Sequence, residues 1–178
     1  MIKYLKKSKP EIEKIEDDRK VRTSVEEILS KIKKDGDDAI RFYSEKFDNY
    51  SPNSFRLSDT QIKECLTKVS SKDLEDIKFA QTQIKNFAEI QKDSMKDVES
   101  ETLPGVILGH KNIPVESVGC YVPGGKFPMI ASAHMSVITA SVAGVERIIA
   151  SAPPQNGSPH PAIVAAMHLG GAHEIYCL

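Results

Sequence analysis

The carboxyl-terminal third of the chain alternates between strand-like and helix-like segments, and this order restricts the fold more than any other feature. An apolar run enters a Pro-Gly-Gly turn, and a helix rich in small residues follows from about Pro128 to Ala143. A strand (147–151), a second helix (about 160–171) and another strand (174–178) come next. Such alternation is typical of a parallel, doubly wound sheet. Because strand-helix-strand crossovers are right-handed, we expect the ligand crevice at the carboxyl ends of the strands.

The turn from Val122 to Gly125 is the first candidate binding site. Glycines after a strand let the backbone approach a ligand, and Pro128 suits the first turn of a helix whose free N–H groups attract anions. Two phosphate motifs are absent, since G-x-G-x-x-G does not occur and Phe127 follows Gly-Lys where a P-loop needs Ser or Thr. The residues alone leave a structural turn and a ligand-binding turn equally open.

Composition changes near residue 100. The first hundred residues hold 42 of the 49 charged side chains but only one of the ten glycines. They read as helices with charged outer faces, with starts predicted at a Thr23–Glu26 capping box, at Asp37 and at Ser58, and a stop at Gly36. The longest helix is expected over about 72–92. Its predicted apolar stripe consists of Leu74, Ile77, Ile84, Phe87 and Ala88.

Strand-like sequence links the two halves. Residues 97–118 contain a Pro104-Gly105 turn between extended pieces, which predicts a short antiparallel ribbon. His110 and Lys111 on this ribbon could hold an anionic substrate, although a hydrogen-bonded surface histidine is the simpler interpretation. We therefore divide the chain into a helical region with a short ribbon (1–118) and a nucleotide-binding domain (119–178).

Charge and cysteine usage narrow the class of protein. A net charge of −1 provides no strong field for nucleic acid or a membrane surface, and no apolar run is long enough to span a bilayer. Three widely spaced cysteines, Cys65, Cys120 and Cys177, indicate buried thiols in a reducing, cytoplasmic setting. Five histidines are present without an H-E-x-x-H pattern, so we expect no metal ligands and no catalytic constellation in this chain.

Several motifs carry a resemblance to a known family. The segments KIKKDGDDAIRFYSEKFD, ETLPGVILGHKNIPVESVG and GCYVPGGKFPMIASAHMSVITASVAGV occur in this order. Together they resemble the histidinol dehydrogenase family, and HKNIPV and ASAHMSV are similar to its sulfopropanediol 3-dehydrogenase branch. The resemblance runs along essentially the whole chain and implies a Rossmann-like fold.

The resemblance also implies a chemistry. Tyr121 of the YVPGG motif would contact NAD, with Pro123, Gly124 and Gly125 forming the same wall; a tyrosine packed at a strand end is the alternative. His134 could approach the nucleotide, or lie on a helix surface. The family's reaction implies oxidation of a primary alcohol, 2,3-dihydroxypropane-1-sulfonate or L-histidinol, to a carboxylate with two NAD, in a homodimer. Its zinc ligands and Glu-His pair belong to segments beyond Leu178.

The chain stops within an apolar strand, and we expect it to be the amino-terminal portion of a longer enzyme, with an incomplete sheet and no activity of its own. A second hypothesis keeps the chain as it is. It would then be a non-catalytic module that binds a nucleotide or supports an oligomer.

Overall fold

The computed structural model describes residues 11–124 and 127–178, and these fall into two compact units that divide between Phe47 and Asp48. The predicted boundary at 118/119 falls inside the second unit and stays a prediction.

The first unit is a pair of helices, α1 (Glu11–Asp35) and α2 (Asp37–Asp48). Gly36 separates them at φ +58°, and its N–H donates to the Ile32 carbonyl, so the predicted helix stop is confirmed. The capping box predicted at Thr23 is wrong, because the Thr23 hydroxyl donates to the Arg19 carbonyl (3.0 Å) inside α1. The charged residues before Thr23 are good helix formers and continue the helix toward its amino end.

Two further helices begin the second unit, α3 (Asp59–Thr67) and α4 (Ser71–Ser94). The capping box predicted at Ser58 is confirmed: the Gln61 N–H donates to the Ser58 hydroxyl (3.3 Å), and the Ser58 N–H donates to Oε1 of Gln61 (2.9 Å). Ile77 and Ala88 of α4 are buried as predicted. Phe87 is 62% exposed, which corrects its assignment to the apolar stripe.

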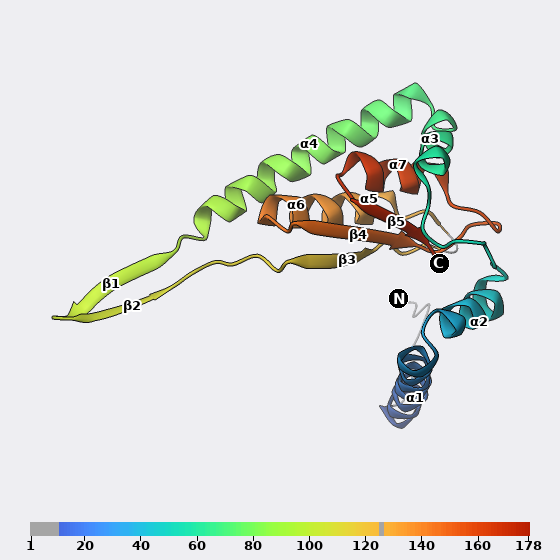
Figure 1. Cartoon of the computed structure of the whole chain (residues 1–178), viewed down its shortest axis with the longest axis horizontal. Helices are drawn as coiled ribbons and strands as arrows, with labels where there is room; N and C mark the ends of the chain where they lie inside the picture. The colour runs from blue at the N-terminus through green and yellow to red at the C-terminus, as the bar shows by residue number, and fades with distance from the viewer. Residues whose placement is uncertain (1–10, 125–126) are drawn as a thin grey trace, which may run out of the picture. The chain divides into compact units, whose positions relative to one another are not determined.

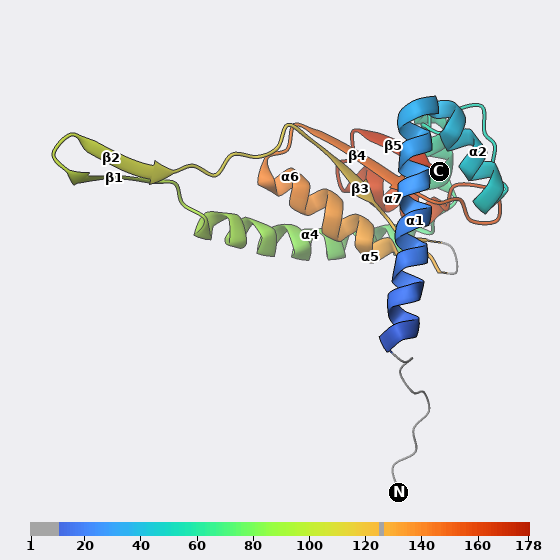
Figure 2. The same cartoon turned by 90° about the horizontal axis from the view of Figure 1, so that it is seen from below.

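A hairpin of β1 (Val98–Leu103) and β2 (Val106–His110) follows, antiparallel as predicted. Gly105 adopts φ +80° in its turn, and the Gly105 N–H donates to a Glu101 carboxylate oxygen (2.7 Å). Figures 1 and 2 show the hairpin extending from the end of α4, away from the sheet of the same unit. Every residue of both strands is exposed.

The sheet consists of β3 (Ser117–Tyr121), β4 (Arg147–Ala152) and β5 (Glu174–Cys177), all parallel and in the order β3-β4-β5. This confirms the predicted α/β class with a helical part before the sheet. One face packs against the helices, and its buried side chains alternate along the strands, as Ile148, Ala150 and Ala152 do on β4. In Figure 1 the helices α4, α6 and α7 lie on the same side of the sheet.

The outer edge of β5 is already paired. The Leu57 N–H donates to the Ile175 carbonyl and the Cys177 N–H to the Phe55 carbonyl, both at 2.9 Å. Residues 55–57 therefore run antiparallel beside β5, with a bridge between Arg56 and Tyr176. Sequence analysis did not identify this short extension, because three extended residues carry no periodic signal.

The helix predicted over 128–143 forms as three consecutive pieces: α5 (Ile130–Ala133), a π-helical turn η1 (His134–Ile138) and α6 (Thr139–Ala143). It begins at Ile130, after Pro128, and Gly144 ends it at φ +92°, as predicted. The π turn was not predicted. The second helix is α7 (Pro161–Leu169).

The core lies between the sheet and these helices, and small side chains dominate it. Ala133, Ala150 and Ala166 have no exposed surface, which lets the helices approach the strands closely. Within the described ranges, 11–124 and 127–178, no helix is long and apolar enough to cross a membrane.

Candidate functional site

The turn after β3 lies beside the turn after β4, at the carboxyl edge of the sheet. The Val122 N–H donates to the Ser151 carbonyl (2.7 Å), and Val122 is fully buried. A Cβ added to Gly124 would lie 2.8 Å from Cγ of Pro153. Only glycine therefore lets the two turns pack this closely without a shift.

Tyr121 is the last residue of β3 and precedes this turn. Its side chain is 61% exposed, so the ring is accessible at the edge where ligands bind in open α/β sheets. Pro123 and Gly124 are half-buried next to it. Gly125, the fourth residue predicted for this site, lies outside the described residues.

The helix that follows the turn starts without a side-chain cap. Met129 occupies the N-cap position and makes no side-chain hydrogen bond there. By contrast, Ser58, Ser70 and His160 accept hydrogen bonds from the first turns of α3, α4 and α7. The first backbone N–H groups after the turn are therefore not capped by Met129, and uncapped N–H groups at a helix start favour anions.

His160 also belongs to this edge, because α7 begins where the loop after β4 ends. Its Nδ1 accepts from the Ile163 N–H at 3.4 Å, and burial lowers the pKa of the ring, which keeps it neutral at pH 7. The sequence predicted a helix from about residue 160, and α7 confirms it, with His160 at the N-cap and Pro161 in the first turn.

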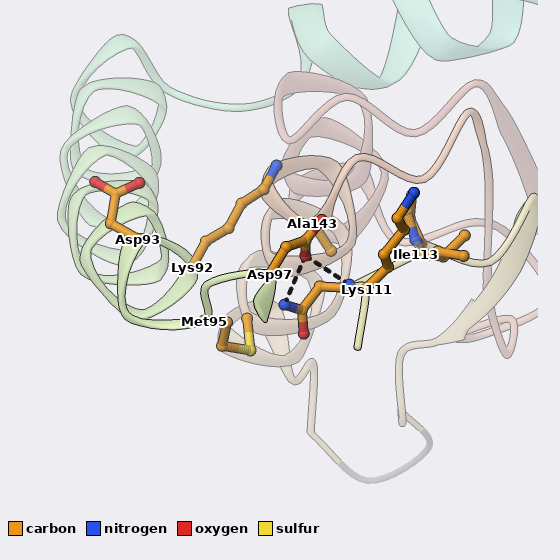
Figure 3. A pocket seen from close by; sticks show the side chains of 9 residues that line it. Lys92, Asp93, Met95, Asp97, Lys111, Ile113 and Ala143 are labelled. Atoms are coloured by element: carbon orange, nitrogen blue, oxygen red, sulfur yellow. Dashed lines mark hydrogen bonds between the residues drawn. The ribbon is translucent and has the colours of Figure 1, made fainter. Parts of the chain in front are cut away.

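His110 and Lys111 lie elsewhere. The ring of His110 donates from Nε2 to the Lys96 carbonyl (3.1 Å), so this residue is the hydrogen-bonded surface histidine of the simpler interpretation. The Asp97 carboxylate accepts from the Asn112 N–H (2.8 Å) and side-chain amide (3.1 Å), and these bonds hold the pKa of Asp97 below its usual range. Figure 3 shows this junction.

A cleft of about 720 Å³ surrounds the junction, with Lys92, Lys111 and Ala143 among its lining residues. Ala143 ends α6, which leads to the amino end of β4, whereas Tyr121 is at the carboxyl end of β3. The structure therefore separates Lys111 and Tyr121 by the length of the sheet and does not bring them into one site.

Two of the remaining histidines have hydrogen-bond partners within the fold, and the cysteines are buried. His134 is buried against Gln81 of α4, and His173 accepts through Nδ1 from the Ile148 N–H (2.9 Å). The three cysteines are free and buried, as predicted, and burial raises the pKa of Cys177 to about 11. Among the described residues, no three His, Cys, Asp or Glu side chains gather where a metal ion could bind.

Comparisons with known proteins agree with this geometry. The histidinol dehydrogenase family model matches residues 12–178. A histidinol dehydrogenase homolog of Shouchella clausii is 51% identical over the whole chain, which covers 42% of that protein. The sulfopropanediol 3-dehydrogenase of Ruegeria pomeroyi is 44% identical over 99% of this chain and 40% of its own length. The chain thus spans about two fifths of these relatives.

A solved structure shares the fold. The crystal structure of histidinol dehydrogenase from Elizabethkingia anophelis superposes with a TM-score of 0.81 and 28% identity, over 98% of this chain and 38% of that one. The expected motif order, the parallel sheet and the match of nearly all residues to one family model agree. The chain therefore belongs to the histidinol dehydrogenase family.

Proposed function

We propose that this chain supplies the first part of an NAD-dependent dehydrogenase that oxidises a primary alcohol, and that the turn after β3 holds the dinucleotide. The observation that carries the proposal is the close approach of Gly124 to Pro153, with the exposed ring of Tyr121 beside it. This arrangement leaves bare backbone and an aromatic face at the carboxyl edge of a parallel sheet, where such folds bind nucleotides.

The residues of the turn fit the dinucleotide in different ways. Tyr121 offers a ring face and a hydroxyl to the cofactor, while Pro123 and Gly124 line the same wall; the motif assigns Gly125, outside the described residues, to the same site. The uncapped start of the following helix favours the phosphates. When bound at this turn, NAD would supply the hydride acceptor for oxidation of the alcohol carbon.

Zinc is part of the family expectation, but residues of this chain that could hold it are not identified, since the described residues contain no ligand cluster. We assign no step to a metal here. The proton-transfer residues are likewise expected outside this chain.

The substrate class follows from the family and its named members. We infer a small polar primary alcohol, either 2,3-dihydroxypropane-1-sulfonate or L-histidinol, that is oxidised to a carboxylate. A relative named sulfopropanediol 3-dehydrogenase, with 44% identity, supports the first alcohol. A cytoplasmic homodimer is the expected setting, and three free, buried thiols are consistent with a reducing compartment.

The dinucleotide site is tested by titrating the chain with NAD, using Gly124→Ala and a matched control, Gly119→Ala. A Cβ at Gly119 meets no atom within 4 Å, whereas one at Gly124 collides with Pro153. We expect Gly124→Ala to weaken NAD binding about tenfold or more, because the turn must shift, and Gly119→Ala to leave the affinity unchanged. Equal affinities for the two variants would remove the turn from the site.

Tyr121→Ala provides a second measurement on the same site. The ring is mostly exposed, so its loss should weaken NAD binding while the melting temperature stays nearly the same. An unchanged affinity would exclude Tyr121 from the nucleotide site.

The alternative function is a nucleotide-binding or oligomerisation module without catalysis. The observation in its favour is that the chain spans only about two fifths of its relatives. An assay of NADH formation by the full-length protein, with each of the two alcohols and with and without a chelator, distinguishes the two functions. NAD binding without turnover of either alcohol favours the module.

A further inference from the structure

The π turn η1 contains a buried polar cluster that the proposed site does not use. Gln81 of α4 is 8% exposed and His134 is 4% exposed. The side-chain amide nitrogen of Gln81 donates to the Ala166 carbonyl of α7 (2.9 Å) and lies 3.2 Å from Nδ1 of His134. One side chain thus joins three helical segments.

These contacts decide the protonation state of His134. The Ala166 carbonyl can only accept, so the amide nitrogen of Gln81, and not its oxygen, must face it. The same nitrogen faces Nδ1 of His134, which must therefore accept as well. His134 is held as the neutral ring with its proton on Nε2, because a protonated ring would place two N–H groups against each other.

The π turn also contacts the end of β3. Ser136 donates to the Ser132 carbonyl (2.7 Å), and its hydroxyl lowers the pKa of the Cys120 thiol, against the larger effect of burial. Cys120 immediately precedes Tyr121. The extra residue of a π turn allows His134 and Ser136 to reach α4 and β3 from one helix, and such turns occur frequently at functional sites.

We propose that His134 is a positioning residue for the nucleotide turn: as a neutral acceptor it fixes η1 on α4 and α7 and, through Ser136 and Cys120, the end of β3 that carries Tyr121. This inference rests on the proposed function. Protonation of His134 breaks the bond from Gln81 and loosens the turn.

The titratable groups around Gln81 and His134 also disfavour a protonated His134 ring. Lys78 and Lys85 of α4 line a cleft of about 300 Å³ together with Gln81, and their positive charges oppose a second cation. Cys120 and Tyr121 are the titratable residues of β3, and burial raises the pKa of the Cys120 thiol, so that thiol stays neutral. His168 of α7 is exposed, and α5 and α6 carry no titratable side chain.

The sign of the pH effect follows from the burial of His134, which lowers the pKa of its ring. Below the ordinary histidine pKa of about 6.5, the unfolded or loosened state takes up a proton more readily than the fixed state. The contribution of His134 to the stability of the fixed turn is therefore complete above about pH 6.5, and it is lost as the pH falls further.

The experiment compares the wild-type chain with His134→Asn and with a control, His168→Asn, from pH 7.5 to 5. Asparagine at position 134 offers an oxygen near the place of Nδ1 and does not titrate. We expect the wild type and His168→Asn to lose affinity for NAD about tenfold at the acid end, and His134→Asn to stay nearly level. His134→Leu should bind weakly at every pH, because it leaves a Gln81 N–H without an acceptor.

Nitrogen NMR and hydrogen exchange provide readouts that do not need NAD. The ring of His134 should appear as the Nε2–H form, and amide exchange at Cys120–Val122 should accelerate in acid in the wild type but not in His134→Asn. An Nδ1–H ring, or identical pH profiles for wild type and His134→Asn, overturns the proposal. Failure of every protein to bind NAD would contradict the proposed function, while the exchange data would still test His134.

Discussion

The three-stranded sheet and the hairpin of the same unit both contain large aliphatic residues. Those residues are buried in the sheet and exposed in the hairpin. Ile148 and Ile175 of the sheet are 1% exposed, whereas Ile107 of the hairpin is 64% exposed. The strands of both structures are paired through their backbones, with a register shift between Glu101 and Leu103 in the hairpin. The difference is that α6 and α7 cover the sheet, while no described helix or strand of the same unit covers the hairpin. The hairpin therefore depends on backbone hydrogen bonds and turn chemistry.

This comparison separates two contributions to β structure. Isolated two-stranded hairpins are marginal in water, since they bury little apolar surface. The sheet gains stability from side chains between two layers, where each buried aliphatic residue contributes about 1.5 to 3 kcal/mol. Apolar composition alone therefore does not show which strands form the core.

The largest expected effect tests directly whether buried side chains stabilise the sheet but not the hairpin. Ile175→Ala should lower the free energy of unfolding by about 2 to 5 kcal/mol, because it leaves a cavity under α7. The matched change Ile107→Ala in the hairpin should alter it by less than about 0.5 kcal/mol. Urea unfolding of the two variants measures both values. Similar losses would mean that the hairpin is part of the cooperative core.

A second prediction concerns pH. Burial raises the pKa of the Cys177 thiol to about 11, whereas an unfolded cysteine titrates near 8.5. Above about pH 8.5 the unfolded chain loses this proton first, so stability falls as the pH rises toward 11. Urea unfolding at pH 7.5 and 10 should show this loss. In Cys177→Ala the slope should be smaller but not zero, because burial also raises the pKa values of Cys65 and Cys120. If stability depended on pH equally in Cys177→Ala and in the wild type, the raised pKa of Cys177 would be contradicted.

The smallest expected effect on global stability is in the hairpin. A Cβ at Gly109 would lie 2.0 Å from the Val98 carbonyl oxygen, so Gly109→Ala must break the pairing there. Amide exchange in 98–110 should become fast, while the unfolding free energy of the sheet changes by less than about 0.5 kcal/mol. A large global loss would show that the hairpin stabilises the sheet.

Local signals predicted most of the elements correctly. Ser58 with Gln61, Gly36, Gly144 and the Pro104-Gly105 turn act through nearby backbone groups, and the structure has each where it was expected. The parallel sheet followed from alternating element types. Thr23 was misread because a sequence cannot show that the helix has already begun.

Other features depend on partners distant in the chain. The exposure of Phe87, the pairing of 55–57 with β5 and the π turn at His134 each depend on contacts across many residues. The YVPGG turn was recognised as a candidate site by its motif. Its packing against Pro153 was not predicted, since the two residues meet only when β3 and β4 pair.

The sequence by itself determined the helix ends, the turns, the α/β order and the family, because these depend on short-range sterics, capping and motif identity. Only the tertiary structure decided which apolar residues are buried, that Lys111 and Tyr121 lie at opposite ends of the sheet, and that His134 meets Gln81 in the core. Burial and hydrogen-bond partners are properties of packed surfaces, and a residue acquires them only when distant segments come together.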